Sequence, residues 1–118
     1  MTAEDISYGR ITVAPRAIAT LVVHAILQSY GVVGLAPKNL VDGITHVLVH
    51  DPRHGVEVKA VGDQIVIDVF IMVEYGTRIS SVATSVANTV RYHVERALGM
   101  PVGAVNVHVQ DLHVSDVD

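Results

Sequence analysis

Among the residue types in this sequence, histidine most readily suggests a chemical function, which is metal binding. His46, His50 and His54 are spaced four residues apart, which would place three imidazoles near one face of a continuous helix, as metal binding requires. Pro52 interrupts such a helix before His54, and the chain has no cysteine to complete a ligand set. The pattern therefore favours solvated surface histidines, and we expect neither a metal nor a cofactor.

The remaining histidines lie in segments with clear periodicity. His24 and His93 fall in two expected helices, and His108 and His113 fall on or near the last expected strand. The simplest interpretation is that each is packed or lies at an edge. The alternative is pH sensing, because imidazole titrates near neutral pH.

Two carboxylates interrupt or end an otherwise apolar segment. Asp68 and Glu74 are six residues apart, so roughly 20 Å separates them along an extended strand and they cannot form one catalytic pair. We therefore expect Asp68 to be exposed or salt-bridged. A nucleophile-elbow context is absent around Ser29, Ser80, Ser81 and Ser85. We assign no catalytic residue and predict that the protein is not an enzyme.

One glycine pair has the spacing of an RNA-binding clamp. Gly31 and Gly34 match the Gly-x-x-Gly letters of a KH module, and Lys38 follows them. However, eight Lys and Arg residues against twelve Asp and Glu residues give a net charge of −4. Phosphate recognition needs a basic surface, so RNA binding is the weakest of the alternatives considered.

The composition predicts one small domain with an aliphatic core. Half of the 118 residues are hydrophobic and only 4% are aromatic. The length fits a single domain over residues 1–118, with its core within about 8–114. The first ten residues do not resemble a signal peptide, and the apolar stretch Ala17–Tyr30 is too short and too polar to span a bilayer. We therefore expect a cytoplasmic protein that does not insert directly into the membrane.

Two long helices are expected from hydrophobic periodicity. The first begins at Pro15, carries an apolar stripe from Ile18 to Ile26, and is expected to end in a left-handed cap at Gly31. The second has a stripe from Ile79 to Leu98 and ends at Gly99, with Ser80 or Ser81 as the expected N-cap. Leu40–Val49 is interpreted as a shorter inserted helix, and Gly31–Pro37 as a tight connector.

The strands complete an α+β pattern. Ile11–Val13 is a short strand, Val56–Ala60 and Ile65–Val73 are joined by the hairpin signal Gly62-Asp63, and Val105–Gln110 alternates cleanly. The order is β-α-(α)-β-β-α-β. It predicts a two-layer sandwich in which two long helices cover one face of a four-stranded, mostly antiparallel sheet.

Four segments together resemble the alkaline-shock-protein family of bacterial envelope stress response proteins. They are Tyr8–Val13, Tyr30–Ala36, Val73–Ile79 and Val105–Gln110. The resemblance extends from about Tyr8 to Val114, and the segment Lys38–Thr45 is similar to one in the compact branch of the family.

The resemblance implies a cytoplasmic, non-enzymatic protein linked to envelope integrity. It implies self-association into a homo-oligomer, an integral membrane protein as a possible anchor, and a fatty-acid-kinase-like protein as a possible partner. No catalytic residues carry over from the family. The motif positions that we take as candidate interaction residues are Tyr75, Gly76, Thr77, Arg78, Asn106 and His108.

Two functional hypotheses follow. The first is a self-associating scaffold or adaptor at the inner envelope, because the aliphatic content exceeds what one small core needs and would otherwise form an exposed patch. The second is a small-ligand or lipid-handling accessory module linked to fatty-acid phosphorylation. It rests on Ile65–Val73, which is apolar on both faces and could wall a pocket.

Overall fold

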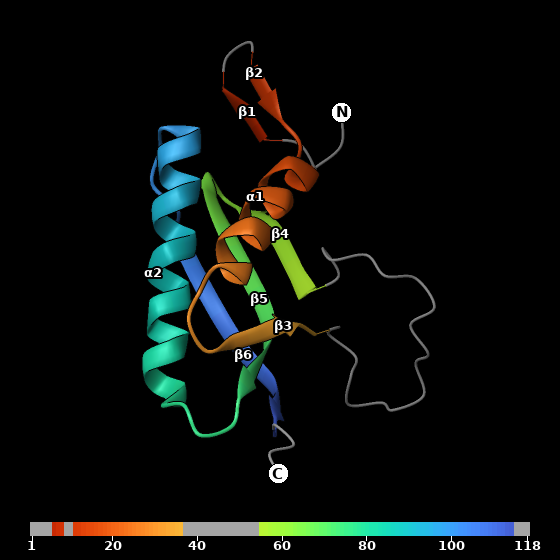
Figure 1. Cartoon of the computed structure of the whole chain (residues 1–118). Coiled ribbons are helices and arrows are strands. Elements are labelled where there is room, and N and C mark those ends of the chain that lie inside the picture. Colours follow the sequence, from red (N-terminus) through yellow and green to blue (C-terminus); the bar gives the residue numbers. More distant parts are fainter. Residues whose placement is uncertain (1–5, 9–10, 37–54, 115–118) are drawn as a thin grey trace, which may run out of the picture.

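Two helices lie on one face of a four-stranded sheet, and a small hairpin stands at one end of the molecule (Figure 1). The computed structural model describes residues 6–8, 11–36 and 55–114. The predicted α+β two-layer architecture is confirmed. In chain order the elements are β1 (Ile6–Tyr8), β2 (Ile11–Val13), α1 (Pro15–Leu27), β3 (Val32–Leu35), β4 (Val56–Val61), β5 (Gln64–Glu74), α2 (Ile79–Leu98) and β6 (Ala104–His113).

All pairing in the main sheet passes through β5. Its first half pairs antiparallel with β4, from Val61 opposite Gln64 to Val56 opposite Val69. Its second half pairs antiparallel with β3, and nearly its whole length pairs parallel with β6. Strands β3 and β4 therefore follow one another along one edge of β5, and β6 occupies the other edge.

The core lies between β5 and the helices. Alternate residues of a strand point to the same face, and those of β5 that face the helices, from Ile65 to Val73, are buried. Helix α2 presents valines four residues apart, from Val82 to Val94, and all are buried. The same cluster contains the apolar face of α1. The expectation of an aliphatic core is met.

The structure corrects two strand assignments. The expected connector Gly31–Pro37 contains β3, in which Val32 lies opposite Val73 and Leu35 opposite Ile71. Strand Ile11–Val13 exists, but it pairs with β1 and not with the main sheet. β3 therefore takes the place in the sheet that was expected for Ile11–Val13. A strand of four residues is stabilised by its long-range partner, so local periodicity does not reveal it.

The helix ends differ from expectation at two of four positions. Helix α1 begins at Pro15 as predicted, but it ends at Leu27 with Gln28 as its C-cap. Helix α2 has Arg78 as its N-cap, without a side-chain cap hydrogen bond, so neither Ser80 nor Ser81 caps it. In the turn before α2, the Thr77 hydroxyl donates to the Glu74 carbonyl at 2.7 Å. Helix α2 ends at Gly99 as predicted, and this glycine is its C-cap in the left-handed conformation.

Some predictions fall outside the described residues. These are the inserted helix Leu40–Val49, the histidines His46, His50 and His54, and the segment Lys38–Thr45. Among the helices that the structure describes, none is long and apolar enough to span a membrane.

Gly31 provides a test of how closely the turn before β3 packs on α2. Its φ is 86°, and a Cβ added there would lie 2.6 Å from Val82 Cγ2. Gly76 is a matched control, because its φ is 99° but an added Cβ would meet no atom within 4 Å. We expect Gly76→Ala to cost about 1–2 kcal/mol of unfolding free energy, the backbone penalty alone. Gly31→Ala should cost about 1–3 kcal/mol more, from overpacking.

Urea denaturation of both variants measures this difference. The double variant Gly31→Ala/Val82→Ala should show coupling, because Val82→Ala removes the clashing methyl groups. Equal losses of unfolding free energy in Gly31→Ala and Gly76→Ala would show that the turn does not pack tightly on α2.

Candidate functional site

The sheet face opposite the helices carries a buried carboxylate. Asp68 is 7% exposed, and among the described residues it is the one buried residue that is polar or charged. It lies opposite Asn106 of β6 and Glu57 of β4 in the sheet register. Figure 1 shows both helices on the other side of the sheet. Among the described residues, those that contact the Asp68 carboxylate lie on the neighbouring strands β4 and β6.

Three side chains surround this carboxylate, and with it they form what we call the Asp68 cluster (Lys59, Asp68, Asn106 and His108). The Asn106 amide donates to Asp68 Oδ1 at 3.1 Å. His108 Nε2 lies 3.1 Å from the same oxygen, and it must carry a proton there because a carboxylate only accepts. Lys59 Nζ is 3.2 Å from Oδ2, an ion pair without hydrogen-bond geometry.

His108 also covers the neighbouring aromatic ring. Its imidazole stacks on Phe70 with ring centroids 4.5 Å apart and 12° between the planes. Phe70 is 7% exposed, although no described helix covers this face. His108 therefore links the Asp68 cluster to the apolar part of the face.

The cluster lowers the pKa of Asp68. Burial alone would raise it, but the hydrogen bonds from His108 and Asn106 and the nearby ammonium group of Lys59 together outweigh the burial. The carboxylate is therefore ionised and engaged through both oxygens. It is poorly suited to act as a general acid or base. Of the two expectations for Asp68, exposed or salt-bridged, the structure shows the second, because the carboxylate is buried and paired with Lys59.

The sequence motifs found only part of this cluster. They selected Asn106 and His108, and they flagged Asp68 as unusual without joining it to either. Lys59 was missed, because its contact with Asp68 depends on how β4 pairs with β5. The hairpin signal Gly62-Asp63 could have predicted that register. Within the described ranges, no group of three or more His, Cys, Asp or Glu side chains could hold a metal ion.

The other candidate interaction residues follow the carboxyl end of β5, at positions 75–78. There the Glu74 N–H donates to the Gly31 carbonyl at 2.9 Å, and the Tyr75 N–H donates to the His113 carbonyl at 2.8 Å. His113 Nδ1 is also 3.1 Å from Glu74 Oε1. The turns after α1 and β5 and the end of β6 are thus tied together. Gly76, Thr77 and Arg78 form the connection from this point to α2.

Exposed apolar side chains gather around these main-chain bonds. Tyr30 is 81% exposed beside Gly31, and Tyr75 is 64% exposed beside Glu74. Leu112 and Val114 flank His113 and are exposed as well. Ile79, at the start of α2, is also exposed. We call this group the apolar end (Tyr30, Tyr75, Ile79, Leu112 and Val114). It holds part of the surplus apolar surface that the composition predicted.

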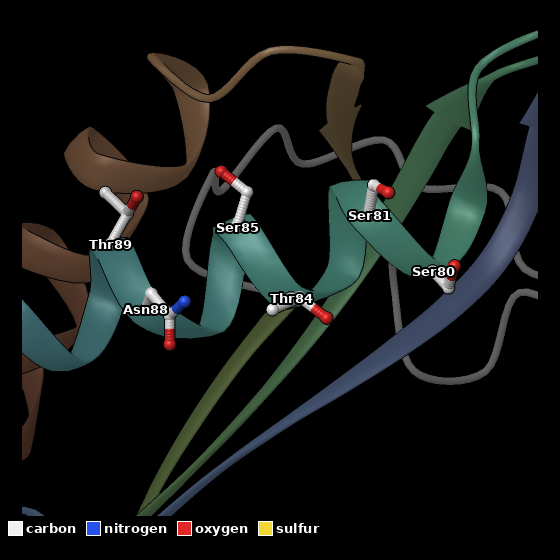
Figure 2. A pocket seen from close by; sticks show the side chains of 6 residues that line it. All are labelled: Ser80, Ser81, Thr84, Ser85, Asn88 and Thr89. Atoms are coloured by element: carbon white, nitrogen blue, oxygen red, sulfur yellow. The ribbon is translucent and has the colours of Figure 1, made fainter.

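A third surface follows α2 and is polar. Figure 2 shows hydroxyl and amide side chains along this single helix. They line a shallow depression of about 490 Å³ and are Ser80, Ser81, Thr84, Ser85, Asn88 and Thr89. None of them is charged or apolar, so this depression does not suit an acyl chain. The helix-facing side chains of β5 pack against α1 and α2 in the core.

The structure places the glycine pair in and beside β3, and the two helical histidines on α1 and α2. Gly31 lies in the turn after α1 and Gly34 lies within β3, so they do not join two helices as a KH clamp does. His24 is exposed on α1, and the half-buried His93 meets the edge of Tyr92.

Asp68 makes the unfolding free energy of the protein depend on pH in the acidic range. Its pKa is lower in the folded state than the value of about 3.9 expected for an unfolded chain. Its contribution to stability is therefore present above that pH and is lost as the pH falls through the folded-state pKa. We expect the unfolding free energy of the wild type to fall between about pH 5 and pH 2, and Asp68→Asn to show a smaller fall.

Chemical denaturation across this pH range tests the prediction. Asp63→Asn, which replaces an exposed carboxylate in the β4–β5 turn, is the control and should retain the wild-type slope. An Asp68→Asn protein with an unchanged slope would contradict the proposed coupling.

Comparison with known proteins identifies the family. A profile of the alkaline shock protein 23 (ASP23) family, described as having a cell envelope-related function, matches residues 3–114. The protein YloU of Bacillus subtilis (strain 168), described as uncharacterized, is 40% identical over 111 residues, covering 92% of each chain. Spy1614 of Streptococcus pyogenes serotype M6, also uncharacterized, is 32% identical over 108 residues, covering 90% of this chain and 89% of the relative.

Solved structures resemble the chain only distantly. A variant of MamM CTD covers 81% of this chain and 93% of its own, with 18% identity and a TM-score of 0.49, and this likeness carries no argument about function. The sequence matches are the decisive finding, since they extend over nearly the whole chain and include the segments that meet around β5. The chain belongs to the alkaline-shock-protein family, whose function is related to the cell envelope.

Proposed function

We propose that this chain is a non-enzymatic, self-associating scaffold or adaptor protein in cell-envelope stress response or homeostasis. It acts through protein–protein contacts near the cytoplasmic membrane. The observation that carries this proposal is the apolar end, where exposed aromatic and aliphatic side chains surround the junction of three strands and a helix.

The apolar end has the character of a contact surface. Tyrosine rings combine a large apolar body with a polar hydroxyl, and they are enriched where proteins meet. The main-chain hydrogen bonds of Gly31, Glu74 and Tyr75 hold the underlying backbone in place. A preordered surface loses less entropy on binding than a flexible one does.

The Asp68 cluster supports a role without catalysis. A catalytic carboxylate needs room for a substrate and a pKa suited to proton transfer, whereas Asp68 is buried, ionised and bound by three neighbours. The cluster is better suited to fixing β4, β5 and β6 together than to chemistry on a ligand.

The envelope connection indicates where the contacts are made. An integral membrane protein is the proposed anchor, and a fatty-acid-kinase-like protein is a possible further partner. The resemblance of the motif segments to the family implies both. The chain would then lie on the cytoplasmic side and reach the membrane through its partner.

We expect membrane retention to depend on the apolar end. The wild type should sediment with native membranes, and the variant Tyr30→Ser/Tyr75→Ser should be at least tenfold less retained, since two aromatic contacts of about 0.7 kcal/mol or more each are lost. Tyr92→Ser is the matched control, because Tyr92 is an exposed tyrosine on α2, outside the apolar end.

Membranes digested with protease separate a protein anchor from lipid. Retention should disappear on digested membranes and on protein-free vesicles of the same lipids. Equal binding to the vesicles would contradict a protein anchor. Retention that is unaffected by Tyr30→Ser/Tyr75→Ser would show that the apolar end is not the contact.

A further inference from the structure

Among the strands that the structure describes, β6 forms one edge of the main sheet. It pairs with β5 along its length, and it has no second partner among the strands that the structure describes. Figure 1 shows β6 at the outer side of the sheet, beneath α2. Every edge strand presents a row of main-chain N–H and C=O groups that another strand can pair with.

The two edges of the sheet differ in how well they would accept a strand. The edge opposite β6 is shared by two separate strands, β3 and β4. It has a register irregularity in β3 and carries Glu57 and Lys59 in β4. In contrast, residues Ala104 to Val109 of β6 pair with β5 without interruption. Only β6 offers a continuous edge.

β6 also lacks the features that usually prevent pairing between edge strands. Proteins protect such edges with lysine, proline, bulges or short strands. From Ala104 to Val109, β6 contains no Asp, Glu, Lys, Arg or Pro. The single register shift and Asp111 come only after this stretch. An edge of this kind can accept another strand.

The sequence of this stretch is complementary to itself. In an antiparallel pair centred on Val107, the valines at 105 and 109 lie opposite each other, and Val107 lies opposite its own copy. Asn106 then lies opposite His108, and no like charges meet. Residues directly opposite in an antiparallel pair point to the same face. The valines of both copies would therefore lie on the helix side.

The polar pair is also suited to this arrangement. Asn106 uses one amide hydrogen on Asp68, and His108 uses Nε2 on the same carboxylate. A second amide hydrogen on Asn106 and the acceptor Nδ1 of His108 remain for the other copy. Asp68 thus fixes the positions of both side chains on this face of the sheet.

We propose that two copies of this chain associate by antiparallel pairing of β6 with β6 about a twofold axis at Val107. The pairing joins two four-stranded sheets into one continuous sheet, and it is isologous because both copies use the same surface. This inference rests on the proposed self-association and adds the surface and the register.

Cysteine cross-linking tests the register, because the native chain has no cysteine. A mixture of the single variants Asn106→Cys and His108→Cys should form a disulfide-linked dimer under mild oxidation, at least five times faster than Val61→Cys alone. Val61 is exposed on β4, at the opposite edge of the sheet, and serves as the control. Cross-linking no faster than the control would overturn the proposed register.

Hydrogen exchange of the wild-type chain provides a test that needs no variant. Dilution should speed amide exchange in β6 at least tenfold and leave β4 unchanged. Sedimentation of the same samples separates the proposal of self-association from the proposal of β6 pairing. An oligomer whose β6 exchange does not respond to dilution overturns the β6 pairing and leaves self-association standing, whereas a monomer at every concentration overturns both.

Discussion

The structure depends on β5 being shared by every other element of the sandwich. Its eleven residues accept β4 and β3 in succession along one edge and β6 along the other. One of its faces supplies the aliphatic residues on which α1 and α2 pack. Its other face supplies Asp68, which holds side chains from both neighbouring strands. A strand in this position tolerates little change, because a shift of one residue would exchange its two faces.

The same register also creates the surfaces proposed for binding. Because β5 ends where β3 begins and where β6 ends, segments distant in sequence meet at one place and expose Tyr30 and Tyr75 there. Because β6 is parallel to β5 and lies at the edge, its valines contact the helix layer while its second edge faces outward. The surplus apolar composition therefore corresponds to a core, an exposed apolar end and a valine-rich edge strand.

Sequence reasoning succeeds where the signal is local. The two long helices follow from apolar stripes, Gly99 from cap chemistry and the β4–β5 hairpin from Gly62-Asp63. It fails where a contact spans the chain. Strand β3 is four residues long and depends on β5 for its stability, and the short strand at Ile11–Val13 pairs locally with β1. Similarly, the motifs select Asn106 and His108, but only the sheet register shows that both bind Asp68.

The central claim is that this chain works by contact with other protein molecules, beginning with its own copies. The most direct test is the molar mass of the wild-type chain, measured by light scattering during size-exclusion chromatography over a dilution series. The account predicts a mass of at least twice 12.6 kDa at high concentration, falling on dilution. A constant mass of 12.6 kDa at every concentration would contradict it.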